Sequence, residues 1–379
     1  MRSAESKKPG VRIQNRIGVR IRIFDLLFLS IVSDASEDCI LKVTIFGSGA
    51  WGTAISLLLH DNGHNVTIWS KFEEEASILR NTRENPLLRG VAIPADINIF
   101  SDIGYAAREA EVVVIAVPSY AVRETVEALR GKLNYDCVVA CMSKGIEKDT
   151  SSLFTGIIKG TLGEDTKVAA VSGPTHAEEV GRRIPTACVA ASEDITVAEQ
   201  VQSLLMNRYF RVYTTTDVVG VELGAALKNI IALCAGACDG LGYGDNTMAM
   251  LMTRGLAEMA DLCVAMGGRK ETIAGLAGLG DLIVTCMSRH SRNRRAGVLI
   301  GQGLPAQDAM REVGAVVEGY YAAAAAHGLA AANNVDMPIC LEAYRVLFED
   351  KPLLTAIKDL LSREKRSEHN TGEETWVIR

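Results

Sequence analysis

Residues 41–52, with the sequence LKVTIFGSGAWG, decide the fold of this 379-residue chain. The run 41–46 is rich in apolar and β-branched residues and leads directly into the glycine pattern G-x-G-x-x-G. A segment of helical length follows as far as His60, and a second apolar run, 66–69, comes after a turn. Because the glycines stand between a strand and a helix, the segment predicts the βαβ unit of a mostly parallel sheet.

The three glycines of this pattern predict a dinucleotide-binding site. Gly47 permits a tight turn, Gly49 lets the backbone approach a pyrophosphate, and Gly52 lets the helix pack closely against the strand. Free N–H groups at the start of the helix can then face the anion. A glycine-rich turn without a ligand is the alternative, but the complete strand–helix–strand context favours the dinucleotide.

Further strands alternate with segments of helical length as far as residue 216. Residues 111–117 form the clearest strand, which is apolar after its first residue, as expected when helices cover both faces of a sheet. Ligands of such folds bind at the carboxyl ends of the strands, so the loops at 118–119, 143–145 and 172–175 are candidate site loops. The other predicted strands are 97–99, 137–142, 167–171 and 210–213, the last of which closes the sheet.

The second half of the chain is predicted to be helical. Asp217 suits the N-cap of a long helix over 218–238, which is rich in alanine, leucine and isoleucine. A second long helix, 247–266, ends at Gly267-Gly268, and glycine-rich turns such as 278–280 separate the later ones. The predicted fold class is therefore α/β, with a Rossmann-type, mostly parallel sheet domain followed by an all-helical C-terminal domain.

The first forty residues differ from the rest. As far as Phe24 they are strongly basic, with Glu5 as the single acid, and a short apolar run over 24–32 follows. The segment can be a signal or transit peptide, a disordered extension, or the product of a start codon placed too early. We expect a poorly ordered extension. The predicted organisation is an extension over 1–40, a dinucleotide-binding domain over 41–216, a helical substrate and catalytic domain over 217–362, and a charged, frayed tail over 363–379.

Composition excludes several classes of protein. A net charge of −6 argues against a nucleic-acid partner, because no strong cationic field surrounds the chain. Nine cysteines, scattered without metal-ligand spacing, indicate a reducing compartment, for which we expect the cytoplasm, and no metal site. The pairs Cys137/Cys141 and Cys234/Cys238 are interpreted as small buried residues. No apolar stretch is expected to be long enough to span a bilayer.

Lys228 is the first candidate for chemistry. On the predicted helix its face holds only small or apolar residues, which leave room for a ligand and lower the pKa of an ammonium group. A lysine in such surroundings can act as a general acid and base. The alternative is a lysine whose stem lies along the helix and whose charge reaches water. The residues on that face are Val221, Gly224, Ala225, Ile231 and Ala232.

Two further segments contain candidate functional residues with polar side chains. Asp281 follows the glycine-rich turn 278–280, and a helix cap or turn residue is its structural alternative. The run 291–295, SRNRR, brings three guanidinium groups together, which suit phosphate because each planar fork can donate to two oxygens. Its alternative is a solvated helix face.

Together these motifs closely resemble those of bacterial-type NAD(P)-dependent glycerol-3-phosphate dehydrogenases. The resemblance runs from about residue 41 to residue 361, with the motifs in the family's order. It rests on seven segments: 47–54 (GSGAWGTA), 143–145 (SKG), 172–175 (SGPT), 227–229 (LKN), 278–282 (GLGDL), 291–295 (SRNRR) and 316–320 (VVEGY).

The resemblance implies a Rossmann domain, a helical domain and a substrate cleft between them. It implies NAD or NADP as cofactor, dihydroxyacetone phosphate and sn-glycerol 3-phosphate as substrates, and Lys228 as proton donor and acceptor with Asp281 positioning it. A role in supplying the phospholipid backbone follows. The implied substrate contacts are Lys144, Gly173, Thr175, Lys228, Asp281, Ser291, Arg292 and Asn293. The implied cofactor contacts, besides Gly47, Gly49 and Gly52, are Ala50, Trp51, Lys71, Lys144, Ala177, Arg292, Val316 and Glu318.

The chain departs from the family pattern in three places. The N-terminal extension has no counterpart, and His176 stands where an aromatic residue, commonly Phe, is usual. Tyr321 and the alanine run 322–326 replace polar and basic residues, although alanine should still form a helix there.

Two other functions remain open at this point. A dehydrogenase of related architecture acting on a β-hydroxyacid also uses a helix lysine, but it has no need of the phosphate cluster at 291–295. An NAD(P)-sensing or scaffold protein would keep the glycines but could lose Lys228 and Asp281. The sequence does not determine the oligomeric state, for which a homodimer is the state we consider first.

The end of the second predicted strand bears on the choice of cofactor. NAD-specific sites place an acid there, which binds the ribose 2′-hydroxyl and repels a 2′-phosphate. Here the strand ends in Ser70-Lys71, and the acids 73–75 suit the start of the next helix. The sequence therefore predicts that NADPH is accepted at least as well as NADH.

Overall fold

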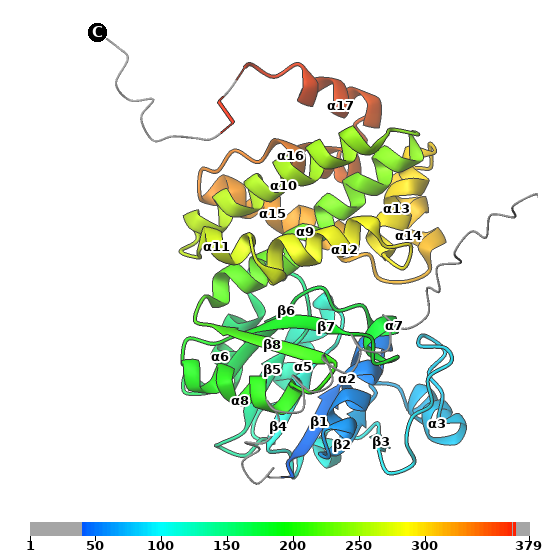
Figure 1. Ribbon diagram of the computed structural model, residues 1–379, viewed down its shortest axis with the longest axis vertical. Helices are drawn as coiled ribbons and strands as arrows, with labels where there is room; N and C mark the ends of the chain where they lie inside the picture. Colours follow the sequence, from blue (N-terminus) through cyan, green and yellow to red (C-terminus); the bar gives the residue numbers. More distant parts are fainter. Residues whose placement is uncertain (1–39, 366, 369–379) are drawn as a thin grey trace, which may run out of the picture. The chain divides into compact units, whose positions relative to one another are not determined.

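An eight-stranded sheet forms the N-terminal half of the computed structural model, which describes residues 40–365, 367 and 368. The strand order is β3-β2-β1-β4-β5-β6-β7-β8, and neighbouring strands are parallel except β6 and β7 (Figure 1). The predicted extension over 1–40 lies outside the described residues apart from Ile40, as does most of the predicted tail. The strands are β1 (Lys42–Phe46), β2 (Asn65–Trp69), β3 (Asn98–Phe100), β4 (Val112–Ile115), β5 (Val138–Cys141), β6 (Lys167–Ser172), β7 (Thr186–Ala191) and β8 (Phe210–Thr215).

Helices cover both faces of this sheet, which explains why its central strands are apolar throughout. Alternate strand residues point to opposite faces, so Val112 and Val114 join one core while Val113 and Ile115 join the other. The first core includes residues of α2 (Ala50–Asp61), α3 (Glu73–Thr82), α7 (Ala177–Val180) and α8 (Ile195–Leu205). The second includes residues of α4 (Ile103–Ala107), α5 (Val122–Leu129) and α6 (Phe154–Leu162).

The glycine pattern has the backbone geometry predicted for it. Gly47 has a φ of 128°, in the region that favours glycine, and a Cβ there would lie 2.5 Å from the carbonyl oxygen of Ala116. A Cβ on Gly52 would lie 1.9 Å from the carbonyl oxygen of Gly47, so the helix and the strand approach as expected. Both positions therefore require glycine.

The sequence did not reveal one strand and misassigned one turn. The segment TACVAA forms β7, which pairs antiparallel with β6 and parallel with β8. Its alanines have little strand propensity. The segment nevertheless forms a strand because β6 and β8 on either side supply hydrogen-bonding partners. The predicted turn at 278–280 is instead part of a π-helical turn, η2 (Leu276–Gly280), that continues into the next helix. π-Helical turns are rare and have no sequence signature of their own.

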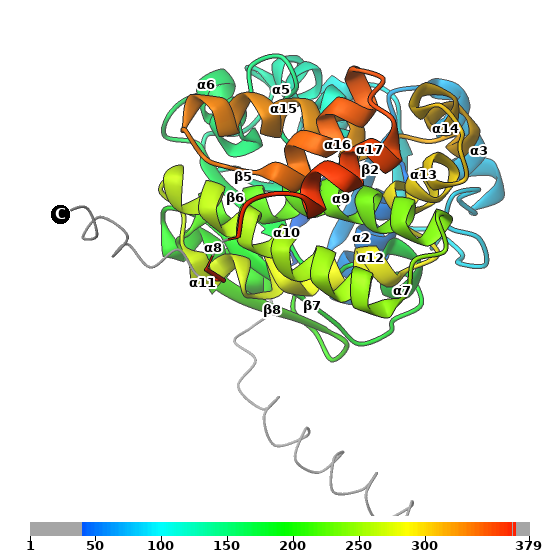
Figure 2. The ribbon, with the colours of Figure 1, turned by 90° about the horizontal axis from the view of Figure 1, so that it is seen from above.

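The helical half is built around α9 (Val218–Gly240), which begins where predicted. The carboxylate of Asp217 accepts hydrogen bonds from the backbone N–H groups of Gly220 at 2.9 Å and Arg269 at 2.8 Å. Figure 2 shows α9 among the other helices, and the described residues after Thr215 contain no strand. Those helices are α10 (Asp245–Ala265), α11 (Lys270–Ile273), α12 (Asp281–Met287), α13 (Arg292–Gly301), α14 (Ala306–Val313), α15 (Glu318–Ala332), α16 (Pro338–Phe348) and α17 (Leu353–Leu361).

The alanine run that departs from the family pattern is helical, as expected. Residues 322–326 lie within α15, and Ala322, Ala323, Ala325 and Ala326 are buried in the core of the helical half. Small side chains let α15 approach α9, which it contacts directly.

Helices α9 and α13 are in backbone-to-backbone contact. A Cβ on Gly236 would lie 2.0 Å from the carbonyl oxygen of Arg294, and one on Gly297 would lie 2.0 Å from that of Leu233. Gly240 and Gly301, one helical turn further on, meet the opposite backbone at 2.3 and 2.4 Å in the same way. Two glycines spaced by four on each helix thus remove the side chains that would separate them.

The expectation that no apolar stretch could span a bilayer needs correction. Within the described residues, α9 is long and apolar enough by length and composition alone. The segments Lys270–Met287 and Arg292–Gly301 pass the same test only as a pair bent by 52°. In α9, however, 83% of the apolar window is buried inside the protein, so a core helix accounts for its composition.

Candidate active site at the sheet edge

Lys228 lies near the middle of α9 and is 6% exposed. Its Nζ donates to Oδ1 of Asp281 at 2.9 Å and to Oγ1 of Thr285 at 2.8 Å. Burial lowers the pKa of Lys228 and the Asp281 carboxylate raises it, with a net value of about 8. An ammonium with a pKa near the working pH can both give and take a proton.

Asp281 joins Lys228 to a second lysine from the sheet half. Its Oδ2 accepts a hydrogen bond from Nζ of Lys144 at 2.7 Å, and Ser172 Oγ lies 3.5 Å from the same oxygen. Burial raises the pKa of Asp281, but the charges and hydrogen bonds of the two lysines outweigh burial and leave it below its ordinary value. The carboxylate therefore stays ionised although it is only 2% exposed.

The loop after β6 completes this centre. Lys144 also donates to the carbonyl oxygen of Gly173 at 2.9 Å and to Oγ1 of Thr175 at 3.3 Å. Gly173 has a φ of 157°, and a Cβ there would lie 2.8 Å from Cα of Cys188 on β7. The antiparallel strand that the sequence did not reveal thus sets the path of this loop.

The predicted phosphate cluster lies at the start of α13. Ser291 caps the helix by accepting from the backbone N–H of Arg294 at 3.2 Å, and the Arg292 side chain is exposed. Asn293 is buried and donates to Oδ1 of Asn229, next to Lys228, while its own Oδ1 accepts from Gly319 N, each at 2.8 Å. A helix N-terminus beside a guanidinium group suits an anion.

The residues expected to hold a dinucleotide fit one. A Cβ on Gly49 would meet nothing within 4 Å, so the backbone there is open to a ligand. Gly49 is also the N-cap of α2. Because it has no side chain to cap the helix, the backbone N–H groups near Ala50 are left to bind an anion. Trp51 Nε1 is buried without a hydrogen-bond partner among the described residues, and Ala177 packs against the same core.

Glu318 lies in the first turn of α15 and contacts the loop after β4. Its Oε1 accepts from the backbone N–H of Ser119, which follows β4, at 3.1 Å. Its Oε2 is buried and has no partner in the described part of the chain, and burial raises the pKa of this carboxyl group. Val316 lies two residues earlier and is half-buried. A bound cofactor can satisfy Oε2, which supports the implied role of Glu318.

The end of β2, where a cofactor ribose is expected, contains an acid that sequence spacing did not place there. Glu75 lies in the first turn of α3 as predicted, but its Oε2 also accepts from the hydroxyls of Ser70 at 3.0 Å and Ser48 at 3.2 Å. Lys71 is exposed and pairs with both carboxylate oxygens of Glu124 at 2.7 Å. Exposed pairs of this kind are weak, so Lys71 can exchange its partner for a ligand.

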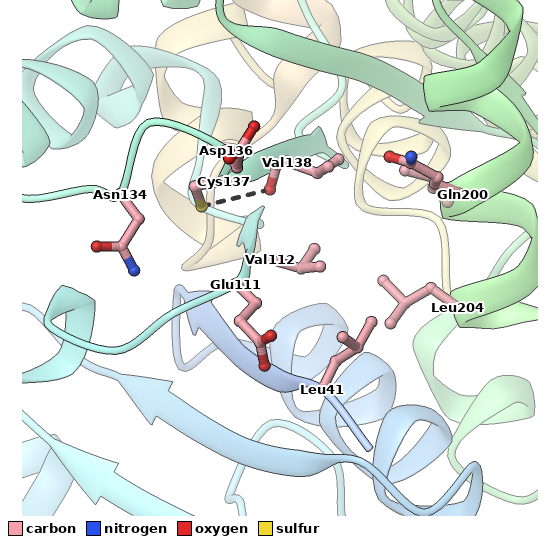
Figure 3. Close-up of a pocket in the computed structure, with 10 residues that line it drawn as sticks. Leu41, Glu111, Val112, Asn134, Asp136, Cys137, Val138, Gln200 and Leu204 are labelled. Carbon is pink, nitrogen blue, oxygen red and sulfur yellow. Dashed lines mark hydrogen bonds between the residues drawn. The ribbon is translucent and has the colours of Figure 1, made fainter. Parts of the chain in front are cut away.

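A separate cavity of about 340 Å³ lies at the other end of the strands, away from the lysine–aspartate centre. Leu41, Val112 and Val138 line it at the amino ends of β1, β4 and β5 (Figure 3). The two carboxylates that line the cavity have hydrogen-bond partners within the protein: Glu111 accepts from Lys42 N at 2.9 Å, and Asp136 accepts from Lys167 Nζ at 2.9 Å. The cavity is therefore distinct from the lysine–aspartate centre, which lies beyond the carboxyl ends of the strands.

Sequence reasoning missed Thr285 and did not foresee the contact that Ser119 makes. Thr285 donates to the carbonyl oxygen of Asp281 at 2.6 Å and accepts from Lys228, so it fixes the direction of the ammonium group. Its position four residues after Asp281 on one helix was the only available signal. Ser119 was singled out only by its place after a strand, and its bond to Glu318 could not be foreseen.

Known proteins match both halves of the chain. The family models described as NAD-dependent glycerol-3-phosphate dehydrogenase N-terminus and C-terminus match residues 42–198 and 217–358. A glycerol-3-phosphate dehydrogenase (NAD(P)+) of Agathobacter rectalis is 48% identical over 333 residues, which cover 88% of this chain and 99% of that protein. One from Fusobacterium nucleatum is 47% identical, covering 86% and 98%.

A solved structure shows the same architecture. The glycerol-3-phosphate dehydrogenase of Coxiella burnetii superposes with a TM-score of 0.82 at 34% identity, covering 86% of this chain and 99% of that one. Family models that match both halves, and relatives that align over nearly their whole length, lead to one conclusion. The chain belongs to the family of NAD-dependent glycerol-3-phosphate dehydrogenases.

Proposed function

We propose that this protein catalyses reversible hydride transfer between dihydroxyacetone phosphate and sn-glycerol 3-phosphate, with NAD or NADP as cofactor. The observation that carries the proposal is the buried centre of Lys228, Asp281 and Lys144. It combines a lysine of pKa about 8 with a carboxylate that orients it. The exposed Arg292 on the neighbouring helix α13 supplies a cation for a phosphate group.

Lys228 provides the proton in this mechanism. When bound, the nicotinamide supplies a hydride to the ketone carbon. The Lys228 ammonium donates its proton to the ketone oxygen, so the carbonyl becomes a secondary alcohol and the lysine becomes a neutral amine. Asp281 and Thr285 hold Nζ in place during the transfer. In the reverse direction the neutral amine accepts the hydroxyl proton.

The remaining residues bind and position the reactants. Lys144 and the loop at Gly173 and Thr175 lie beside the centre and can contact the substrate. Arg292 holds the phosphate, aided by the N-terminus of α13 that Ser291 and Asn293 fix in place. Binding the phosphate at one end places the carbonyl at Lys228, and such orientation supplies much of the rate acceleration.

A direct assay tests the proposal. We expect oxidation of NADPH or NADH by the purified full-length chain when dihydroxyacetone phosphate is added, and formation of glycerol 3-phosphate. Turnover of a β-hydroxyacid with no response to dihydroxyacetone phosphate would instead favour the related dehydrogenase. Binding of NADPH with no turnover of either substrate would favour a cofactor-sensing protein.

Replacing Arg292 with alanine should weaken the use of phosphorylated substrate. We expect kcat/KM for dihydroxyacetone phosphate to fall by a factor that corresponds to about 2 kcal/mol or more of transition-state stabilisation, because a charge-assisted contact is lost. Unphosphorylated dihydroxyacetone should be a poor substrate of the wild type and should be affected far less. Arg295→Ala, at an exposed position on the same helix, is the matched control. Equal losses on both substrates would assign Arg292 to folding or cofactor binding.

Replacing Lys71 with aspartate should change the cofactor preference. We expect the wild type to use NADPH at least as well as NADH, and the variant to shift toward NADH roughly tenfold, about 1.4 kcal/mol. The shift arises because a cation near the 2′-phosphate becomes an anion. Glu75→Gln should shift preference the other way, since it removes the acid beside Ser48 and Ser70. An unaltered ratio of kcat/KM for the two cofactors in Lys71→Asp would contradict the assigned ribose site.

Three finer statements belong to the same proposal. The eight cysteines among the described residues are all free, which supports a reducing compartment and hence a cytoplasmic location. In that setting the product would supply the glycerol phosphate backbone of phospholipids. For the oligomeric state we propose a homodimer, which light scattering of the purified chain would test.

A further inference from the structure

His176 lies in the site loop after β6, immediately before α7. It follows Thr175, whose hydroxyl accepts from Lys144, and it precedes Ala177. Although it occupies the N-cap position of α7, its side chain makes no capping hydrogen bond. Its Nε2 atom is buried and has no hydrogen-bond partner within the described residues. Unpartnered buried nitrogens are uncommon in folded proteins and cost about 1–3 kcal/mol each.

The surroundings of this imidazole are those of the catalytic centre. Burial lowers the pKa of His176, and so do the positive charges of Lys228 and Lys144, against smaller opposite influences of Asp281 and Glu178. At neutral pH the ring is therefore neutral, with one nitrogen as donor and the other as acceptor. A neutral imidazole is poorly suited to bind a phosphate dianion. It is well suited to a neutral hydroxyl group.

We propose that Nε2 of His176 recognises the substrate's terminal hydroxyl group, on the carbon that flanks the carbonyl on the side away from the phosphate. This inference rests on the proposed function. The ketone oxygen is assigned to Lys228, and the phosphate is assigned to Arg292 and the start of α13. No residue has yet been assigned to the terminal hydroxyl in particular, and His176 Nε2, in the loop whose Thr175 contacts Lys144, is a buried polar atom without a partner among the described residues. His176 thus selects α-hydroxyketone phosphates over ketone phosphates that lack this hydroxyl.

The alternative is that His176 only fills space in place of an aromatic ring. A space-filling role predicts that phenylalanine, which has a similar planar shape, substitutes without any change in substrate choice. Recognition of the hydroxyl predicts a change that depends on the substrate. The two roles therefore differ in a ratio of specificities and not in the absolute activity.

Two substrates and three variants separate these roles. Dihydroxyacetone phosphate is compared with hydroxyacetone phosphate, which keeps the ketone and the phosphate but has a methyl group where the hydroxyl stands. We expect the wild type to favour the hydroxylated ketone about tenfold in kcat/KM, and His176→Phe to reduce this preference to near unity. His176→Gln keeps a donor and an acceptor and should restore part of the preference. His327→Phe changes a histidine stacked on Tyr344 in the helical half and should leave the preference unaltered.

A binding measurement complements the kinetics. Titration calorimetry of glycerol 3-phosphate into each variant saturated with reduced cofactor, with which this alcohol cannot react, should show a Kd raised about tenfold in His176→Phe and only slightly raised in His176→Gln. The affinity of each variant for NADPH alone, followed by nicotinamide fluorescence, should be unchanged because His176 is not assigned to the cofactor.

The outcomes are distinguishable. If the wild type reduces neither ketone, the proposed function is wrong and this inference fails with it. If the wild type reduces dihydroxyacetone phosphate but its preference is the same in His176→Phe, only this inference is overturned. A uniform loss on both substrates in His176→Phe, with an unaltered ratio, would assign His176 to packing and would also overturn it.

Discussion

Lys228→Met is expected to lower kcat for reduction of dihydroxyacetone phosphate by at least about 100-fold, the size of effect typical of a lost general acid. Methionine has a similar length and suits the buried site, but it carries no proton to donate. Cofactor affinity should remain nearly unchanged, because the glycine pattern is untouched. A variant within a few-fold of the wild-type kcat would falsify the assignment of Lys228 as the acid and base.

The pH profile gives a second readout for Lys228. Reduction needs the ammonium form, so kcat/KM should fall as pH rises above about 8, where this group loses its proton. Oxidation of glycerol 3-phosphate needs the neutral amine, so its kcat/KM should fall as pH drops below about 8. The residual activity of Lys228→Met should lack both dependences. Lys358→Met, on the short helix α17 outside the site, is the control.

Asp281→Asn should reduce activity by about as much as Lys228→Met. The asparagine keeps the shape but removes the charge that both Lys144 and Lys228 contact, so we expect kcat/KM to fall about 100-fold or more. Asp281 raises the pKa of Lys228, so its loss should also move the alkaline limb of the reduction profile to lower pH. The measurement is kcat/KM as a function of pH for wild type and variant.

The shift of that limb distinguishes catalysis from folding. A variant that is merely less stable would lose activity without a change in the pH at which the profile bends. Asp308→Asn, at a surface acid on α14 that pairs with Arg311, should leave both the rate and the profile unaltered. If Asp281→Asn retained the wild-type profile, the electrostatic link between Asp281 and Lys228 would be refuted.

The sequence predicted the elements whose signals are local. The glycine pattern, the apolar strands and the Asp217 cap all depend on neighbouring residues, and each appears where expected. β7 was not foreseen because its strand character comes from pairing with β6 and β8, which are distant in sequence or run the opposite way. The π-helical turn before Asp281 likewise packs against a distant element: a Cβ on Gly224 of α9 would lie 2.8 Å from the carbonyl oxygen of Ala277 in this turn.

The candidate residues of the site could be named from the sequence, most of them through the family resemblance, but their arrangement could not be foreseen. Lys228 was recognisable from the small side chains on its own helix face. That Asp281 bridges Lys228 and Lys144 was not, because these residues come from three elements separated by 53 and 137 positions in the chain. Spacing also placed Glu75 only at the start of α3, whereas its side chain reaches back to Ser48.

The glycine contacts between α9 and α13 have a consequence for the length of the substrate. α9 carries Lys228 and α13 begins with Arg292, so the distance between the assigned reaction centre and the assigned phosphate contact depends on how these helices pack. Backbone atoms meet directly at Gly236 and Gly297, and no change of rotamer can alter that separation. The main chain therefore sets the helix spacing that carries the reaction centre and the phosphate contact, and the reach of the Arg292 side chain adds to it.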